Sequence, residues 1–252
     1  MSIFAHMNDK DDYKMRPVLQ MMKLWRHVFK LDPDRELGNE DLAAICRSGT
    51  DAILIGGSTG VTYENTVELL DRVQQYDLPC ALEVSDLEAA VPGFDLYLIP
   101  MVLNTPDPAW IVGHHRRAIE RYGFLIPWDQ VVTEGYIVLN DDSAVARLTG
   151  AETALSGDEA AAYAQVADRL MSLPVVYLEY SGRFGDMETV QTVRESLEHS
   201  QLFYGGGITC EAEARQAAAL CDTVVVGNII YRDVQQALLT VEAVRKTRPI
   251  EF

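Results

Sequence analysis

The sequence predicts an α/β protein built as a single (β/α)8 TIM barrel. Short runs rich in β-branched and aromatic residues alternate about eight times with longer amphipathic segments, which is typical of parallel strands joined by crossover helices. The chain of 252 residues, 48% of them hydrophobic, can bury one large core. The predicted strands are His27–Asp32, Ala52–Ser58, Cys80–Ser85, Asp95–Val102, Gly135–Asn140, Pro174–Glu179, Leu202–Gly207 and Thr223–Asn228.

The segments between these strands carry helix start signals. Ser156 and Glu159 have the spacing of a capping box, and Pro108 stands in a predicted first turn, where proline costs no hydrogen bond. Apolar residues at helical spacing support the other segments. The predicted helices are a helix capped by Asn39, then Thr62–Tyr76, Asp107–Tyr122, a helix from Ser156 to Met171, Glu188–Glu198, Glu211–Leu220 and Asp233–Lys246.

Two places depart from the regular alternation. Only residues 86–94 separate the third and fourth strands, and this segment contains Pro92 and Gly93, so a full helical crossover does not fit there. We therefore expect a shortened third crossover, and a groove where the barrel wall is thin. Before the fifth strand, Leu125–Val132 is predicted to be an insertion that packs on the barrel.

The chain is expected to form one catalytic domain, residues 18–252, behind a flexible leader of residues 1–17. The leader carries charges where a signal peptide needs an apolar stretch, and no apolar run approaches the ~18 residues of a membrane span. The pattern leaves open whether Val18 to Trp25 forms a short helix. These features favour a cytoplasmic protein.

Charge and cysteine spacing exclude several function classes. With 21 basic and 38 acidic residues the formal net charge is −17, which disfavours a general nucleic-acid binder and a protein held to anionic lipid by charge. If the protein binds a phosphate group, a few nearby donors must bind it, because the net charge of the protein does not attract it. The cysteines lack Cys-x-x-Cys spacing and zinc-finger intervals to histidine, so we expect reduced, mostly buried thiols. They are Cys46, Cys80, Cys210 and Cys221.

The predicted strand Pro174–Glu179 places one carboxylate at its end, directly before a Ser-Gly turn. Alternation puts Glu179 on the same face as Val175 and Tyr177. The alternative interpretation is that Glu179 is only a strand-end residue whose side chain points into water. Because the carboxyl ends of barrel strands form the catalytic face, Glu179 is nevertheless a candidate catalytic group.

Glycine-rich turns end the seventh and eighth predicted strands, at 205–207 and at Gly227-Asn228. Backbone N–H groups without side chains can approach an anion, and a following helix N-terminus adds the positive end of its dipole. One such turn is explained by a tight connection alone. Two on neighbouring strands favour a phosphate site, and neutral donors allow an acidic protein to hold the anion.

Lys30 and Asp32 end the first strand on one face. The two can form a structural ion pair. Beside a phosphate site, however, Asp32 becomes a candidate ligand for Mg²⁺, which prefers one or two carboxylates together with substrate phosphate oxygens. The hydroxyl groups of Ser58 and Thr59 are candidates for the same ion or its diphosphate, and Glu83 is a candidate for lining the pocket.

Tyr-Leu-Glu-Tyr-Ser-Gly at 177–182, together with Lys-Leu-Asp-Pro at 30–33, is a specific combination, whereas Gly-Gly-Gly-Ile at 205–208 is weak alone. With these motifs the chain resembles the geranylgeranylglyceryl phosphate synthases and their bacterial relatives, the heptaprenylglyceryl phosphate synthases, from about Trp25 to Lys246. Further matching motifs are Gly49-Thr50-Asp51-Ala52, Gly56-Gly57-Ser58, Val91-Pro92-Gly93-Phe94-Asp95 and Val226-Gly227-Asn228.

The resemblance implies a homodimeric TIM barrel that uses Mg²⁺ to transfer a polyprenyl group, here expected to be heptaprenyl, from its diphosphate to the C3 hydroxyl of sn-glycerol 1-phosphate. It places Mg²⁺ at Asp32 and Ser58. Glu179 would then orient the hydroxyl and take its proton. The residues implied to hold glycerol 1-phosphate are Lys30, Tyr177, Leu178, Glu179, Tyr180, Ser181, Gly182, Gly207, Gly227 and Asn228.

Three other readings of the residues stay open at this point. A sugar-phosphate isomerase on a phosphate-binding barrel would use Asp32 with Asp141 or Asp142 and would need no metal. A flavin-binding barrel shares the glycine turns and would be yellow. A non-catalytic binder of phosphate ligands would bind both substrates and form no product.

Overall fold

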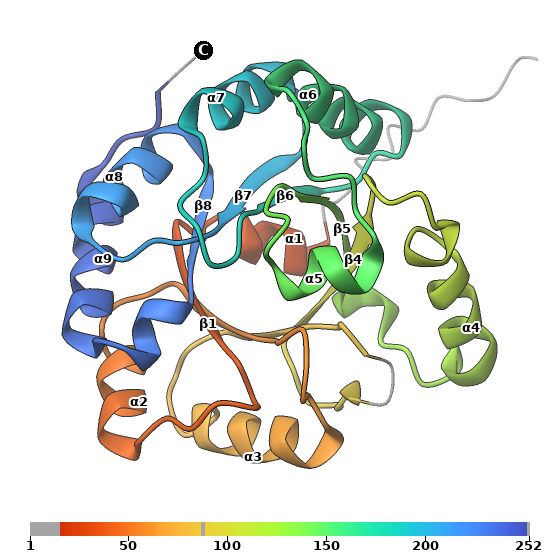
Figure 1. The fold of residues 1–252 in the computed structure, drawn as a ribbon. Helices are drawn as coiled ribbons and strands as arrows, with labels where there is room; N and C mark the ends of the chain where they lie inside the picture. The colour runs from red at the N-terminus through yellow and green to blue at the C-terminus, as the bar shows by residue number, and fades with distance from the viewer. Residues whose placement is uncertain (1–15, 87–88, 251–252) are drawn as a thin grey trace, which may run out of the picture.

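A computed structural model describes residues 16–86 and 89–250. Within these residues, eight parallel strands in chain order form a closed barrel, which confirms the predicted fold class (Figure 1). The strands are β1 (His27–Leu31), β2 (Ala52–Ile55), β3 (Cys80–Glu83), β4 (Leu96–Val102), β5 (Val131–Val138), β6 (Val175–Glu179), β7 (Gln201–Gly205) and β8 (Thr223–Val226).

Helices α2, α3, α4, α6, α7, α8 and α9 surround this barrel, whereas α5 is drawn over its centre (Figure 1). The capping box predicted at Ser156 is present, since its side chain accepts a hydrogen bond from the Glu159 N–H. The α-helices are α1 (Pro17–Met22), α2 (Asn39–Cys46), α3 (Tyr63–Val73), α4 (Gly113–Tyr122), α5 (Ala144–Thr149), α6 (Gly157–Gln165), α7 (Met187–Ser196), α8 (Glu211–Leu220) and α9 (Val234–Lys246). Short 3-10 turns are η2 (Pro108–Trp110), η3 (Trp128–Gln130) and η5 (Asn228–Tyr231), and η4 (Val166–Leu170) is a π-helical segment.

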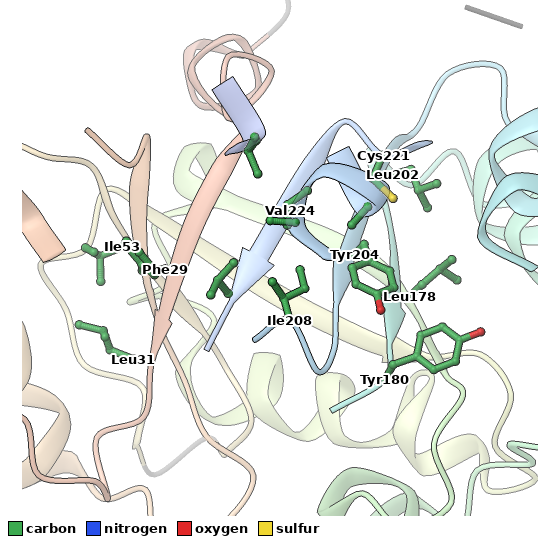
Figure 2. Close-up of a cluster of buried hydrophobic side chains, with 14 of the residues drawn as sticks. Phe29, Leu31, Ile53, Leu178, Tyr180, Leu202, Tyr204, Ile208, Cys221 and Val224 are labelled. Carbon is green, nitrogen blue, oxygen red and sulfur yellow. The ribbon is translucent and has the colours of Figure 1, made fainter. Parts of the chain in front are cut away.

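Alternation along the strands divides the apolar side chains into two cores. One set points outward and packs beneath the helices; Figure 2 shows part of it, including Phe29, Leu178 and Tyr204. The other set, with Leu54 and Tyr177 among it, fills the inside of the barrel. Every second strand residue therefore points into the barrel. The prediction that Glu179 is a candidate catalytic group rests on this alternation.

Helix α1 covers the N-terminal end of the barrel. Val18, Met22 and Trp25 are buried in the same cluster as Val28 and the other interior residues, and α1 lies behind the strands near the centre of Figure 1. The segment that the sequence left open is therefore partly helical. Pro17, the last residue of the predicted leader, begins this helix, whereas residues 1–15 lie outside the described part of the chain.

The shortened third crossover is confirmed. Between Glu83 and Leu96 the described residues form no α-helix, and the segment buries three apolar side chains, Ala89, Val91 and Phe94. The described residues of this crossover therefore form a loop, and the groove expected there stays a prediction.

Two predicted boundaries before β5 are wrong. The predicted helix from Asp107 is interrupted, because η2 ends at Trp110 and α4 begins only at Gly113. The predicted insertion does not pack on the barrel at its start, where Leu125 is 66% exposed, and its last two residues belong to β5 and pair with β4. The reason is that a charged residue, Glu134, interrupts the apolar pattern inside this strand and hides its true beginning.

The four cysteines are free thiols, and three of them are buried, as predicted. In the described part of the chain, the longest helices fall short of the length and apolarity that a membrane-crossing segment requires.

Candidate active site at the carboxyl end of the barrel

The ends of β6, β7 and β8 lie side by side on one rim of the barrel. Glu179 at the end of β6 pairs with Gly205 of β7, and Gly205 pairs in turn with Val225 of β8. The candidate base and the two glycine turns therefore share the carboxyl end of the barrel, where the sequence placed them. This is the arrangement that a barrel active site requires.

The loop after β6 packs directly on the glycine turn after β7. Gly207 has a φ of 55°, and a Cβ atom at this position would collide with the backbone nitrogen of Phe184. Only glycine combines this left-handed conformation with such a close approach. The Gly185 N–H also donates to the Tyr204 hydroxyl at 2.8 Å. The segment that carries the candidate base is thus fixed against the turn predicted to bind phosphate.

The two glycine turns present free backbone donors. No hydrogen bond among the described residues uses the N–H of Gly207, Gly227 or Asn228 as its donor. Asn228 begins η5, and a short extra helix after the eighth strand is a common part of phosphate sites in barrels. These donors can therefore bind an anion.

Arg35 adds a cation beside the second glycine turn. Its Nη1 donates to the Asn228 side-chain oxygen at 3.0 Å, and its guanidinium lies 3.7 Å from the centre of the Tyr231 ring. Arg35 was not predicted as a site residue, although its position three residues after Asp32 in a strand-end loop was a usable signal.

Glu179 is buried rather than solvated, with 2% of its surface exposed. Its Oε2 accepts a hydrogen bond from the Tyr136 hydroxyl at 2.6 Å, and its Oε1 accepts one from the Ser181 N–H. Burial raises the pKa of Glu179 above its ordinary value, although Lys30 and the two hydrogen bonds act against this rise. A buried carboxylate of raised pKa can accept a proton, so the plain alternative of a glutamate in water is wrong.

Lys30 forms its ion pair with Glu83, at 2.5 Å between Nζ and Oε2, and the two side chains are 19% and 7% exposed. The ion pair with Asp32 that the sequence allowed is absent among the described residues, while Glu83 does line the interior. Burial lowers the pKa of Lys30, but the carboxylates of Glu83 and Glu179 outweigh burial and leave the pKa raised. The ammonium therefore stays charged below the rim, 5.8 Å from the centre of the Tyr177 ring.

Asp32 lies at the turn that leads to Ser58. A Cβ atom on Gly57 would collide with the Asp32 carboxylate, so the acid touches this turn, and Ser58 is exposed next to it. The Asp32 N–H donates to the Tyr231 hydroxyl at 2.7 Å, which ties β1 to the loop after β8. Burial raises the pKa of Asp32. The structure thus places Asp32 against the Gly57 turn, one residue before Ser58, and their role as metal ligands stays a prediction.

Asp32 and Ser58 are the residues predicted to hold a metal ion. Across residues 16–86 and 89–250, no group of three or more His, Cys, Asp or Glu side chains is placed to hold a metal ion. One carboxylate and one hydroxyl do suit Mg²⁺ whose other ligands are substrate phosphate oxygens and water.

The side chains of three other predicted residues, Leu178, Tyr180 and Asp141, do not point into the barrel. The side chains of Leu178 and Tyr180 point outward into the core beneath the helices (Figure 2), so they can reach a ligand only through the backbone. Asp141 lies on the loop after β5 with a side chain 73% exposed, 4.0 Å from Arg183. The barrel order puts β5 opposite β1, so this geometry does not support a shared acid pair with Asp32.

Sequence reasoning missed Tyr136 and Glu134, which both point into the barrel from β5. Burial, followed by the charge of Glu179, raises the pKa of Tyr136 well above its ordinary value, so its hydroxyl remains a donor. The alternation from Val132 to Val138 carried the signal for both residues. For Glu134 the signal was lost because the predicted strand started at Gly135, whereas Tyr136 lay within the predicted strand and its hydroxyl was overlooked.

Comparisons with known proteins identify the family of this chain. A family profile described as the PcrB family matches residues 20–245. A heptaprenylglyceryl phosphate synthase of Anoxybacillus flavithermus is 51% identical over 221 residues, which cover 88% of this chain and 96% of that protein. A protein of the same name from Geobacillus kaustophilus is 49% identical over 228 residues, with 90% and 95% covered.

Among solved structures, the (S)-3-O-geranylgeranylglyceryl phosphate synthase of Thermoplasma acidophilum, in complex with sn-glycerol-1-phosphate, has a TM-score of 0.80 at 22% identity. The match covers 92% of this chain and 100% of that one. At this identity the likeness shows the shared fold. The family profile and the relatives of about half identical sequence go further: the chain belongs to the PcrB family.

Proposed function

We propose that this protein is a prenyltransferase that joins a heptaprenyl group from its diphosphate to the C3 hydroxyl of sn-glycerol 1-phosphate. The product is a precursor of an ether lipid, and diphosphate is released. The names of the curated relatives support this reaction. The observation that carries it in the molecule itself is the buried Glu179 on the rim that holds two turns with free N–H donors.

The proposed site for glycerol 1-phosphate joins these two turns to the end of β6. The N–H groups of Gly207, Gly227 and Asn228 would bind the phosphate, and the charged Lys30 would balance its charge. Tyr177 and Glu179 line the barrel interior, while Ser181 and Gly182 lie in the loop that packs on Gly207. The backbone of Leu178 and Tyr180 completes this set, since their side chains point away.

In the proposed reaction the C3 hydroxyl oxygen bonds to C1 of the prenyl group while the bond from C1 to the diphosphate oxygen breaks. Glu179 accepts the hydroxyl proton, and diphosphate leaves with the bonding electron pair. The Tyr136 hydroxyl and the Ser181 N–H hold the carboxylate of Glu179 in place. Mg²⁺, when bound, would neutralise charge on the diphosphate, and Asp32 and Ser58 would hold it.

The prenyl chain is proposed to lie along the barrel wall at the shortened third crossover. Support comes from the absence of a covering α-helix among the described residues there. Val91 and Phe94 are buried in this segment, so a bound hydrocarbon would have to lie against them by displacing part of their present packing, and it would gain stability from that apolar contact. Replacing Phe94 with alanine would then change the chain length that the enzyme prefers, measured with prenyl diphosphates of increasing length.

We infer that the protein acts as a homodimer in the cytoplasm. Helix α4 buries none of its own residues, and apolar side chains stay exposed along and after it, including Ile119 at 47% and Phe124 at 85%. An exposed apolar face of this kind favours contact with a second copy. Sedimentation of Ile119→Asp should show monomers, while Leu170→Asp, at an exposed apolar site on η4, serves as the matched control.

The decisive assay supplies glycerol 1-phosphate or its 3-phosphate enantiomer together with prenyl diphosphates of several lengths. We expect an ether product with the 1-phosphate and heptaprenyl diphosphate. Binding of both substrates without product would instead identify a non-catalytic binder. Isomerisation of a sugar phosphate that survives EDTA would support the isomerase reading, and a yellow protein would indicate a flavin.

A further inference from the structure

Glu134 is a wholly buried acid inside the barrel, two residues before the Tyr136 that binds Glu179. Its side chain is 0% exposed, and neither of its carboxylate oxygens has a hydrogen-bond partner among the described residues. Oε1 of Glu83 is buried and unpartnered in the same way. Three buried acceptor oxygens without a protein donor are costly, which calls for a physical explanation.

The barrel architecture places these groups in one layer. Side chains that fill a TIM barrel form layers contributed by alternate strands, and Lys30, Glu83 and Glu134 come from β1, β3 and β5. Lys30 and Glu83 are in contact at 2.5 Å, which confirms the layer for these two. Glu134 interacts electrostatically with both of them and with Glu179, so it faces the same charged cluster.

This layer gains a hydrogen-bond donor for its buried carboxyl oxygens when Glu134 is protonated. With three ionised carboxyl groups facing one ammonium, the Glu134 carboxylate would be buried without any donor. A neutral carboxylic acid instead carries an O–H that can donate, and the unpartnered Glu83 Oε1 is an acceptor in the same layer. Burial, followed by the charge of Glu83, raises the pKa of Glu134 well above its ordinary value, which agrees with the neutral form.

We propose that Glu134 is a positioning residue that, as a neutral acid, donates a hydrogen bond to Glu83 Oε1 and so fixes the Glu83–Lys30 ion pair. Lys30 then holds its ammonium toward the phosphate of glycerol 1-phosphate, so the inference rests on the proposed function. The neutral form also keeps an additional negative charge away from an anionic substrate. Besides Lys30 and Glu83, the titratable groups facing Glu134 from neighbouring strands are Glu179 and Tyr177.

Two variants distinguish the proposed positioning role of Glu134 from a role in which its side chain only fills space inside the barrel. Glu134→Gln keeps the shape and a donor, so its KM for glycerol 1-phosphate should stay within about twofold of the wild type. Glu134→Met keeps the volume but removes the donor. Its KM for glycerol 1-phosphate should rise about tenfold, the effect of one hydrogen bond to a charged group, with the KM for prenyl diphosphate unchanged. At alkaline pH the wild-type KM should rise as Glu134 ionises, and Glu134→Gln should lack this rise.

Equal KM values for wild type and Glu134→Met would overturn the proposal, and so would a loss in Glu134→Gln as large as in Glu134→Met. Infrared spectra provide a second measurement that needs no turnover. In Glu179→Gln protein at neutral pH we expect the carbonyl band of a protonated carboxylic acid, and a spectrum without that band contradicts a neutral Glu134. If wild-type protein does not bind glycerol 1-phosphate in calorimetry, the proposed function fails, while the infrared band still decides the protonation state.

Discussion

Replacing Glu179 with glutamine tests whether this residue is the base. Glutamine has nearly the same volume, and its side-chain oxygen can still accept one of the two hydrogen bonds that Glu179 accepts from Tyr136 and Ser181. The Tyr136 hydroxyl can rotate to accept from the new amide group. We therefore expect the variant to fold, with a change in the free energy of unfolding of about 1 kcal/mol.

The catalytic loss should be far larger than this structural change. A positioned general base contributes about 10²- to 10⁴-fold to rate, which corresponds to about 2.7–5.4 kcal/mol of transition-state stabilisation. The kcat of Glu179→Gln should fall by this factor, while calorimetry shows that glycerol 1-phosphate still binds. The wild-type rate should also increase with pH as Glu179 loses its proton, above the ordinary value for glutamate because its pKa is raised, and the variant should lack this increase.

The matched control is Tyr136→Phe, which keeps the carboxylate and removes only the hydrogen bond of 2.6 Å. Its kcat should fall by about tenfold, as expected for one hydrogen bond to a charged group. Prenyl transfer is measured at saturating substrate for all three proteins. A kcat for Glu179→Gln within about twofold of wild type would refute proton transfer to Glu179, and loss of substrate binding would assign it a binding role instead.

Three other predictions concern the surrounding structure. Gly207→Ala should lower the free energy of unfolding by more than about 1 kcal/mol and weaken glycerol 1-phosphate binding, because its φ is positive and a Cβ collides with the loop after β6; equal thermal unfolding would contradict this. EDTA should abolish prenyl transfer and Mg²⁺ restore it, with Asp32→Asn needing a higher Mg²⁺ concentration; unchanged activity in EDTA would exclude the metal. His27 is buried, and burial lowers its pKa to about 3, so the unfolded state binds the proton first. Unfolding measurements should therefore show stability decreasing as pH falls from about 6.5 toward 3, by up to about 1.4 kcal/mol per pH unit, and His27→Gln should lack this contribution.

The sequence was sufficient to predict features governed by local periodicity. Strand alternation put Glu179 on the same face as Tyr177 and put Lys30 on one face with Asp32, and parallel strand order brought Glu179 next to the glycine turns. The short interval between the third and fourth strands was enough to predict the missing crossover helix, since a chain of that length cannot form one.

Features that depend on contacts between distant segments were not predictable in this way. Lys30 has Asp32 two residues away, yet its partner is Glu83 on β3, because the closed barrel brings the first and third strands together inside. Glu134 was missed for a related reason. A charged residue in an apolar run looks like a strand boundary, whereas the barrel interior stabilises it through neighbours on other strands.

The position of α1 has a consequence for kinetics. Because this helix blocks the amino end of the barrel, both reactants and both products are expected to enter and leave at the carboxyl end. A prenyl diphosphate that arrives first and binds at Asp32 and Ser58 would lie beside Tyr231 in the segment after β8 and obstruct the smaller substrate. Catalysis is then expected to follow a compulsory order, with glycerol 1-phosphate first, and an excess of the prenyl donor should slow turnover.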